Sequence, residues 1–384
     1  MFSFFSKNEK DKYSLIIDIQ SGLVRSALIH IKSDGSHIIK KVITKIIPRK
    51  SHTNSNYINK MMIKALSESL TAVIDNKRIE NINVILSSPW VLSHSKTVRI
   101  DFGKDTEITQ GLISGLIDIE RKKLEKEFSV NHKNIPEFYN DLKYIEQKIF
   151  DIKLNGYSVT QYIGRTVKDF TISLAMTLSS KIILGRIEST IKKDVFSKKI
   201  KFHSGLLLNF TALRKMMADK NDYVYIHAHS ELTDVIVVKR GQCANISSFP
   251  LGTSSLVRMT AHVLKQEIEV ADSMISLYQG KKLEEAEANR IKLIVDIFGK
   301  NWIALYNKIL DTSIDIGGIP RLIFLSTHSH ADLFKDIVIA SAKEEMHIID
   351  FNLENMESDI TFEKNSEQNQ LIKMYALALV EDMI

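Results

Sequence analysis

The stretch SLIIDIQSGLVRSALIH, residues 14–30, decides the fold. An apolar run ends in Asp18, a turn with Ser21 and Gly22 follows, and a second, alternating apolar run begins at Val24. This pattern predicts a strand, a tight turn and a returning strand with a carboxylate at the tip. Backbone N–H groups and a hydroxyl at such a tip can face a phosphate or its metal ion. Most hairpins with one Asp have no such role, so the interpretation depends on the rest of the chain.

A second segment of the same kind lies far downstream, at residues 225–238. Its tip carries Glu231, Thr233 and Asp234, which again place a carboxylate beside a hydroxyl. Two such hairpins facing each other across a cleft can hold a phosphate chain from both sides. The repeat therefore suggests an internal duplication.

Composition narrows the class of protein. The 384 residues, 44% of them hydrophobic and 26% charged, predict a globular protein with one large divided domain or two. A single cysteine, Cys243, excludes an internal disulfide and a cysteine-based zinc cluster, and it fits a reducing cytosol. The net charge of +6 comes from scattered lysines without a basic run, so nucleic-acid binding is not expected. No apolar run approaches the roughly 20 residues that span a bilayer.

Hydrophobic spacing predicts alternating strands and helices along the chain. In the first part of the chain the spacing predicts three strands within 14–47, a helix over 56–76 and a buried strand over 82–90. In the second part it predicts one long helix over 254–278, two helices over 283–296 and 301–312, a buried strand over 319–327 and a last helix over 364–384.

Six segments follow one another along the chain, and they read IIDIQSGLVRSALI, VILSSPW, IEQKIFDIKLNGYSV, YIHAHSELTDVIVVKRG, FPLGTSSLVRMTAHVL and RLIFLSTHSHADLF. In this order they resemble motifs of the actin-like ATPase superfamily, and in particular of its FtsA/PilM-like members. They look like the first phosphate motif, the strand entering the inserted subdomain, the last strands of that insert, the second phosphate motif, the segment after it and the adenosine motif.

The resemblance implies a two-lobed, actin-like (ribonuclease H-like) α/β fold with an inserted α+β subdomain in the first lobe. The expected division is a flexible tail over 1–12, lobe I over 13–81 and 181–209, the insert over 82–180, lobe II over 210–350, and a helix over 364–384 that returns to lobe I. That last helix lacks the basic polar face of a membrane-targeting helix, and we expect it to pack on the first lobe.

The resemblance also implies a site for ATP and Mg²⁺. Asp18 and Asp234 would hold the metal ion. The positions that match nucleotide-binding residues are Asp18, Ser21, Gly22, Thr233, Asp234, Gly252, Thr253, Ser326 and Thr327.

Three departures from the motifs predict weakened or absent ATP binding. Gln20 stands where the first motif usually has glycine, and His227 and His229 stand where the second usually reads Asp-x-Gly. The adenosine motif has Ser326 to Ser329 in place of consecutive glycines. Those glycines let the backbone approach phosphate and base closely. No catalytic base is evident, so no catalytic residue is assigned.

Two His-x-His pairs have a second interpretation. Residues i and i+2 of a strand share a face, so His227 with His229, and His328 with His330, could each chelate a transition metal. The alternative is that these histidines replace lost motif residues and are hydrogen-bonded in the wall of the cleft.

The leading functional hypothesis is a cytoplasmic scaffold resembling FtsA and PilM. It would bind cytoplasmic tails of inner-membrane proteins in type IV pilus assembly or cell division, and would associate with the membrane indirectly. Such a scaffold could also form a homo-oligomer. The opening MFSFFSK and the missing amphipathic tail favour the pilus role. Two other hypotheses remain, an active Mg-ATPase of the same fold and a metal-dependent hydrolase built on the histidine pairs.

Overall fold

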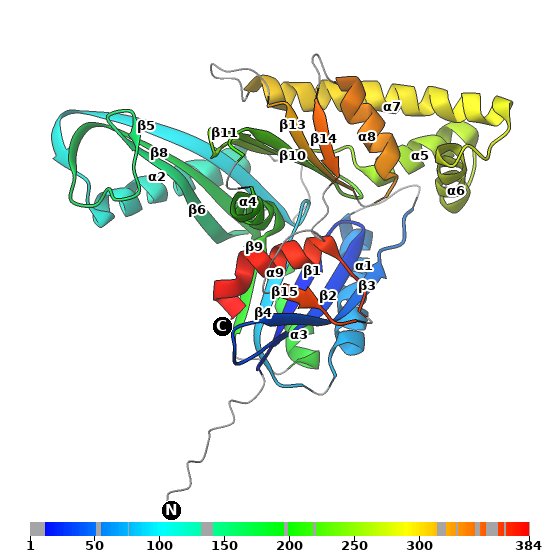
Figure 1. Ribbon diagram of the computed structural model, residues 1–384, viewed down its shortest axis with the longest axis horizontal. Helices are drawn as coiled ribbons and strands as arrows, with labels where there is room; N and C mark the ends of the chain where they lie inside the picture. The colour runs from blue at the N-terminus through cyan, green and yellow to red at the C-terminus, as the bar shows by residue number, and fades with distance from the viewer. Residues whose placement is uncertain are drawn as a thin grey trace, which may run out of the picture.

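The computed structural model describes most of the chain and contains three β-sheets (Figure 1). Residues 1–11, nearly all of the expected flexible tail, lie outside the described residues. The described ranges are 12–50, 55–75, 77–131, 141–195, 199–217, 220–312, 320–327, 329–341, 346–350, 360–364 and 366–383.

The first sheet has the strand order β15-β3-β2-β1-β4-β9. Its first three strands in sequence form an antiparallel meander, and the others run parallel to their neighbours. The bounds are β1 (Lys12–Ile19), β2 (Leu23–Ile31), β3 (His37–Ile46), β4 (Ile79–Leu86), β9 (Lys199–Ser204) and β15 (Ile360–Phe362).

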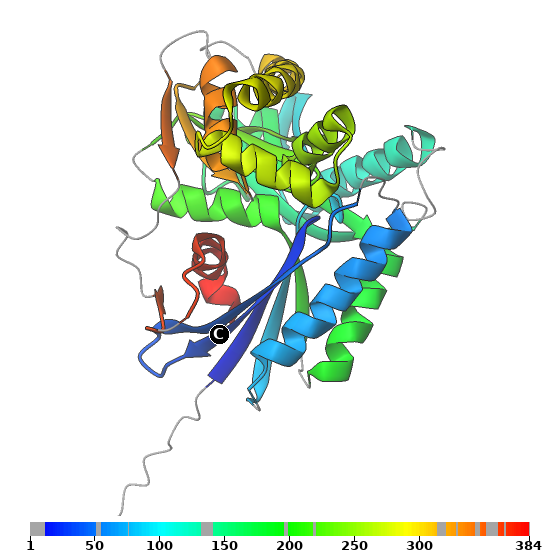
Figure 2. The ribbon, with the colours of Figure 1, turned by 90° about the vertical axis from the view of Figure 1, so that its right-hand side faces the viewer.

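Helices cover both faces of this sheet, which explains the unbroken apolar run in β1. Leu15 and Ile17 belong to the core under α1 (Ser55–Val73) and α3 (Lys181–Asp194), whereas Ile16 belongs to the core under α9 (Gln370–Met383). This alternation follows from the two-residue period of a strand. Figure 2 shows α1 and α3 side by side on one face of the sheet and α9 on the other.

The second sheet repeats this plan with the order β12-β11-β10-β13-β14. Three antiparallel strands are again followed by parallel ones, so this sheet reads 3-2-1-4-5 in its own numbering. The first sheet has the same order with one strand more, because β15 is added beside β3. The bounds are β10 (Tyr223–Ala228), β11 (Thr233–Lys239), β12 (Gln242–Phe249), β13 (Leu322–Thr327) and β14 (His347–Asp350). Both predicted hairpins thus form the same part of their sheets, and this supports the inferred internal duplication.

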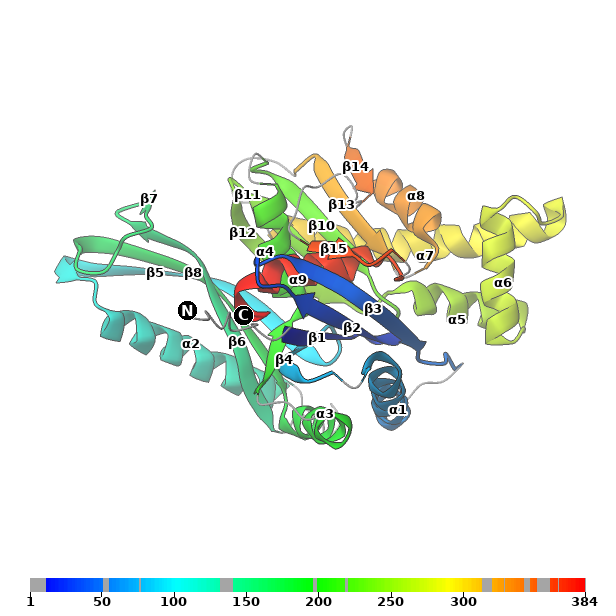
Figure 3. The same cartoon turned by 60° about the horizontal axis from the view of Figure 1, so that its bottom comes forward.

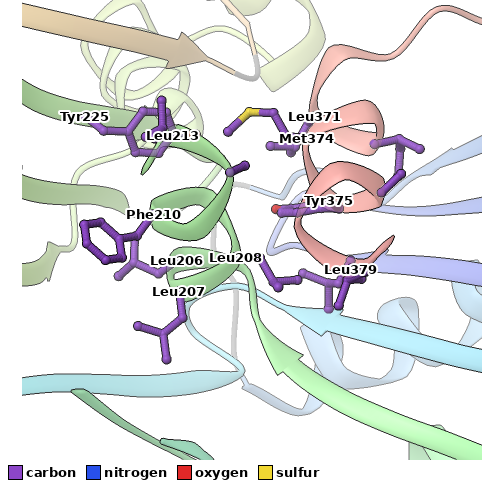
Figure 4. Packing of buried hydrophobic residues seen from close by; sticks show 14 of the residues in the cluster. Leu206, Leu207, Leu208, Phe210, Leu213, Tyr225, Leu371, Met374, Tyr375 and Leu379 are labelled. Atoms are coloured by element: carbon purple, nitrogen blue, oxygen red, sulfur yellow. The ribbon is translucent and has the colours of Figure 1, made fainter. Parts of the chain in front are cut away.

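One face of the second sheet is covered by four helices, α5 (Thr253–Leu264), α6 (Ile268–Gln279), α7 (Glu285–Thr312) and α8 (Ala331–Ser341). The other face packs on α4 (Gly205–Met216), which lies between the two lobes. Figure 4 shows residues of α4, among them Leu208, opposite Tyr375 and Leu379 of α9. The two lobes therefore share one apolar core built around α4 and α9.

The third sheet belongs to a unit inserted between β4 and α3, which projects from the side of the lobes (Figure 1). Its order is β5-β8-β6-β7. One helix, α2, packs along this sheet through Ile113, Ile117 and Leu124 (Figure 3). The bounds are β5 (Val91–Glu107), α2 (Gln110–Asn131), β6 (Leu142–Leu154), β7 (Tyr157–Ser158) and β8 (Thr166–Ser180). The predicted two-lobed α/β architecture with an α+β insert is confirmed.

Some predicted helix boundaries were wrong. The expected helix over 254–278 is split into α5 and α6, because Lys265 adopts a left-handed backbone conformation with φ of 52°. The two helices expected over 283–296 and 301–312 form the single α7. The helix continues through Gly299, where glycine serves packing: a Cβ at this position would lie 3.3 Å from Ile337, so its absence lets α7 and α8 approach each other closely.

The end of the chain also differs from expectation. Residues 360–362 form β15, which the sequence did not predict, and the last helix begins at Gln370 rather than at residue 364. No helix within the described ranges is both long and apolar enough to cross a membrane.

Candidate functional site

The tip of the first hairpin holds Asp18 in a fully buried position. Antiparallel pairing of β1 with β2 places Arg25 directly opposite Asp18, and the guanidinium donates to Asp18 Oδ2 at 2.9 Å. The side-chain amide of Gln20 donates to the same oxygen at 2.8 Å. Burial raises the pKa of the Asp18 carboxyl above its usual value of 3.8, and the charge of Arg25 opposes that rise only in part.

The tip of the second hairpin carries a matching arrangement. The rings of His227 and His229 stack at 3.8 Å, and His229 Nε2 lies 2.8 Å from Asp234 Oδ2. The Ser248 hydroxyl donates to the other oxygen of Asp234 at 2.6 Å. These side chains are at most partly exposed, and both His229 and Asp234 are almost fully buried.

Direct hydrogen bonds join the two tips. His229 Nδ1 lies 3.2 Å from Gln20 Oε1, and the backbone N–H of Glu231 donates to Ser21 Oγ at 3.1 Å. These bonds extend the Arg25–Asp18–Gln20 chain of the first lobe into the second lobe. We call this zone the interlobe junction, defined by Asp18, Gln20, Arg25, His229 and Asp234, the five residues of its hydrogen-bonded chain.

A second set of contacts joins the lobes beyond β3. Arg49 forms an ion pair with Asp272 of α6 at 2.8 Å and donates to Ser254 Oγ of α5 at 2.9 Å. His330 Nε2 also lies 2.8 Å from Asp272. The hydrogen bond from His330 lowers the pKa of the Asp272 carboxyl, and Arg49 adds to that effect. We call Arg49, Asp272 and His330 the latch.

The N-terminus of α5 is occupied by the protein's own backbone. Its first N–H groups, from Thr253 and Ser254, donate to the carbonyl oxygens of His229 and Ser230 at 2.9 and 2.7 Å. A Cβ on Gly252 would lie 2.5 Å from both carbonyl oxygens, so glycine is required for this close approach. N–H groups that could bind an anion at a helix N-terminus are therefore already used.

Other predicted nucleotide residues also have structural partners. Thr233 Oγ1 donates to the carbonyl of Leu251 at 2.6 Å and accepts from Trp302 Nε1 at 3.2 Å. Gly22 accepts a backbone hydrogen bond from Ile47 at 2.8 Å, which closes the first hairpin against the end of β3. These contacts hold the hairpins and the helices in place.

The predicted adenosine motif forms the end of β13. Ser326 pairs in register with His227 and hydrogen-bonds with Tyr225, while Thr327 pairs in register with Ala228. His328 lies outside the described residues.

The histidine pairs do not gather into a metal site in the described part of the chain. His330 bonds to Asp272 of the latch and to Gln279, whereas His229 belongs to the interlobe junction and the ring of His227 stacks on it. Within the described ranges, no three His, Cys, Asp or Glu side chains are placed to hold one ion.

A bound Mg-nucleotide does not fit the residues present. Gln20 and His229, which stand where the nucleotide motifs usually have glycine, bond to each other between the two hairpin tips. Of the two carboxylates that would hold Mg²⁺, Asp234 accepts from Ser248 and Asp18 accepts from Arg25 through Oδ2, while Asp18 Oδ1 has no partner among the described residues. The geometry is that of an interface in which hydrogen bonds between side chains join the two lobes.

Sequence reasoning missed four residues of this site, Arg25, Arg49, Ser248 and Asp272. Arg25 could have been found, because a hairpin turning at Ser21 and Gly22 places it opposite Asp18. Arg49 and Asp272 lie far apart in sequence and outside every motif, so no local signal marks them.

Comparisons with known proteins address the fold. No family model matches the chain, and no curated protein matches its sequence. Among solved structures, a chain of a PilM-PilN type IV pilus biogenesis complex is similar with a TM-score of 0.62 and 10% identity, over 96% of this chain and 98% of that one.

Two other similar structures have lower scores. The ethanolamine utilization protein EutJ from Carboxydothermus hydrogenoformans has a TM-score of 0.42 and 8% identity over 88% of this chain and 84% of its own. A Bacteroides thetaiotaomicron protein of unknown function with an actin-like ATPase fold has a TM-score of 0.42 and 9% identity, covering 99% of each chain. The duplicated sheet topology and the likeness to the pilus-complex chain show that this protein has the actin-like ATPase fold.

Proposed function

We propose that this protein is a scaffold that binds a cytoplasmic segment of an inner-membrane protein in type IV pilus assembly, without turning over ATP. The similar chain at a TM-score of 0.62 comes from a two-protein pilus biogenesis complex, which makes partner binding the first function to consider for this fold. The observation that carries the proposal is a groove along an open strand edge of the insert.

The strand with the open edge is β6. It pairs with β8 from Leu142 to Leu154, but on its other side the described residues pair with it as a strand only at Lys153 and Leu154, through β7. An open edge offers unpaired N–H and C=O groups to an extended peptide. Adding a strand to such an edge is a common way to bind a peptide.

A groove of about 440 Å³ follows this edge where the insert meets the first lobe, and we call it the edge groove. Its walls come from β6, from Phe202 and His203 of β9, from α4 and from Ala378 of α9. Apolar side chains are mixed with three lysines, Lys143, Lys148 and Lys201, against the single carboxylate of Glu146. The groove therefore suits an extended segment that combines apolar and acidic residues.

The interlobe junction supports a scaffold that does not turn over ATP. A scaffold needs its lobes held in one arrangement, and here direct hydrogen bonds between Gln20 and His229 join them. The latch adds the ion pair between Arg49 and Asp272. In the interlobe junction, Gln20 and His229 stand at positions where the nucleotide motifs usually have glycine.

The last helix favours the pilus role over the division role. A division scaffold of the FtsA type would use this helix to reach the membrane. In α9 the apolar residues Ile372, Met374, Tyr375 and Leu379 are buried in the core shared with α4. They are not available for a bilayer, so we propose that membrane association is peripheral and comes through the bound partner.

Site-specific photo-crosslinking in the native cell tests this function. A benzoylphenylalanine placed at Lys143 or Lys201, on two walls of the edge groove, is expected to capture an integral inner-membrane protein on irradiation. The control position is Lys292, an exposed lysine on α7 of the second lobe. Adducts identified by mass spectrometry at the groove positions alone would support the proposal. If neither groove position yields a membrane-protein adduct, the proposed function is wrong.

A further inference from the structure

A second groove lies on the opposite face of the first lobe, between α1 and α3. Its volume is about 590 Å³, and its lining residues come from these two helices. Figures 2 and 3 show the helices side by side, and Ser67 of α1 donates to Asp194 of α3 at 3.3 Å near one end. Lining residues on α3 run from Lys181 to Lys193, a span of about 18 Å along the helix. That length matches about five residues of an extended peptide.

The charge of this groove is one-sided. Four cationic residues, Lys60, Lys181, Arg186 and Lys193, line it, and no carboxylate is among its lining residues. Of these four, only Lys181 has an ion-pair partner within the described ranges, Asp141 at 2.5 Å.

Cations elsewhere on the same helices are paired. Lys192 reaches Glu188 at 2.5 Å, and Lys64 reaches Glu68 at 3.7 Å. The excess positive charge is therefore concentrated in the groove, where an anionic ligand would neutralise it. We call this feature the basic groove.

The floor of the basic groove carries an unsatisfied polar atom. Asn59 lines the groove with only 5% of its surface exposed, and its side-chain oxygen accepts no hydrogen bond from the described residues. A buried acceptor without a donor costs stability, and the N–H group of a ligand in the groove can supply that donor. Gly185 on the facing helix has no side chain and leaves space beside it.

We propose that the basic groove binds an acidic peptide segment of a partner protein. Aspartate or glutamate side chains would pair with Lys60, Arg186 and Lys193, and a backbone N–H would reach Asn59 once its amide turns into the groove. Phosphate groups offer no such N–H, and a flat bilayer does not reach a floor that is almost fully buried. This site is separate from the edge groove and does not depend on the proposed function.

Fluorescence anisotropy with a fluorescein-labelled decaglutamate peptide tests the proposal on the full chain. We expect saturable binding at low ionic strength that weakens as added salt screens the charges. The double variant Arg186→Ala/Lys193→Ala should weaken binding about tenfold, the effect expected from losing two partly screened charge pairs. The matched control is Arg290→Ala/Lys292→Ala, which removes the same charges from the exposed face of α7.

A third variant separates binding from folding. Asn59→Leu removes the amide oxygen that lacks a donor, so the melting temperature of this variant should equal or exceed that of the unaltered protein while its affinity for the peptide falls. Three results would overturn the proposal: no saturable binding by the unaltered protein, equal losses in the two double variants, or decaglutamate binding unaffected by the groove variant while binding to phosphatidylglycerol vesicles is lost. The last would identify a membrane site instead.

Discussion

Replacing His229 by alanine perturbs the interlobe junction at its centre. The imidazole bonds to Asp234 in its own lobe at 2.8 Å and to Gln20 in the other lobe at 3.2 Å. His229→Ala removes both bonds and leaves a carboxylate oxygen of Asp234 and the amide oxygen of Gln20 without these partners. Both residues are 2% exposed, so water replaces the ring only if it enters the junction.

The size of the effect follows from these two groups. A buried polar group that loses its partner costs about 1–3 kcal/mol, so the variant should lose about 2–6 kcal/mol of stability. An unfolding entropy of about 2.1 cal/mol/K per residue gives about 0.8 kcal/mol/K for a chain of 384 residues. The expected fall in melting temperature is therefore about 3–7 °C. His262→Ala, at an exposed position on α5, is the matched control and should leave it unchanged.

Calorimetry or thermal fluorescence measures this difference, and a double-mutant cycle assigns it to the junction. His229→Ala and Gln20→Ala should together cost less than the sum of their separate effects, by about 0.5–1.5 kcal/mol, because each variant alone already breaks the bond between the lobes. A melting temperature for His229→Ala within about 1 °C of the unaltered protein, or strictly additive effects in the cycle, would refute the reasoning.

Three further predictions concern separate parts of the structure. Gly252→Ala places a Cβ 2.5 Å from the carbonyl oxygens of His229 and Ser230, and we expect it to lose several kcal/mol of folding stability. The loss should appear as a low soluble yield and a lowered melting temperature. The control is Gly185→Ala, where a Cβ meets nothing within 4 Å and the melting temperature should stay higher. Asp272→Asn should destabilise the protein at neutral pH by about 1 kcal/mol or less, since the carboxyl is partly exposed. The folded-state pKa of the Asp272 carboxyl is lowered from 3.8, so its contribution to stability is present above pH 3.8 and is lost as the pH falls through the folded-state pKa. The urea midpoints of the variant and of the unaltered protein should therefore converge below about pH 4. A constant difference between these midpoints down to about pH 3 would contradict the latch. Lys148 lines the edge groove and donates to Thr211, and burial lowers the pKa of its ammonium group. The unaltered protein should therefore gain stability relative to Lys148→Met as the pH rises from 8 toward the usual lysine value of 10.5. A difference in melting temperature that does not change with pH would refute this.

Most of the architecture could be predicted from local patterns. The hairpin at residues 14–30 and its counterpart at 225–238 each begin the antiparallel part of a sheet, and the two sheets share one strand order apart from the added β15. Apolar periodicity identifies such elements because each lobe buries its strands between layers of helices. Helix ends were less predictable, since Lys265 turns left-handed with no glycine to announce it.

The interlobe junction could be predicted only in outline. The missing motif glycines showed that Gln20 and His229 differ from nucleotide-binding residues, and the structure places these two side chains 3.2 Å apart. That the two replacements bond to each other depends on how the lobes pack around α4 and α9, which no local pattern encodes. Arg49 and Asp272 meet for the same reason, through the relative position of β3 and α6.

Titration with Mg-ATP tests the central claim most directly, namely that protein side chains join the two lobes where a nucleotide would bind. We predict no heat of binding by calorimetry and no change in melting temperature in millimolar Mg-ATP. A ligand present at about 100 times its dissociation constant would stabilise the folded state by about 2.7 kcal/mol, which such an experiment detects easily. Saturable ATP binding that is lost in Asp18→Ala would contradict the account and favour an active Mg-ATPase.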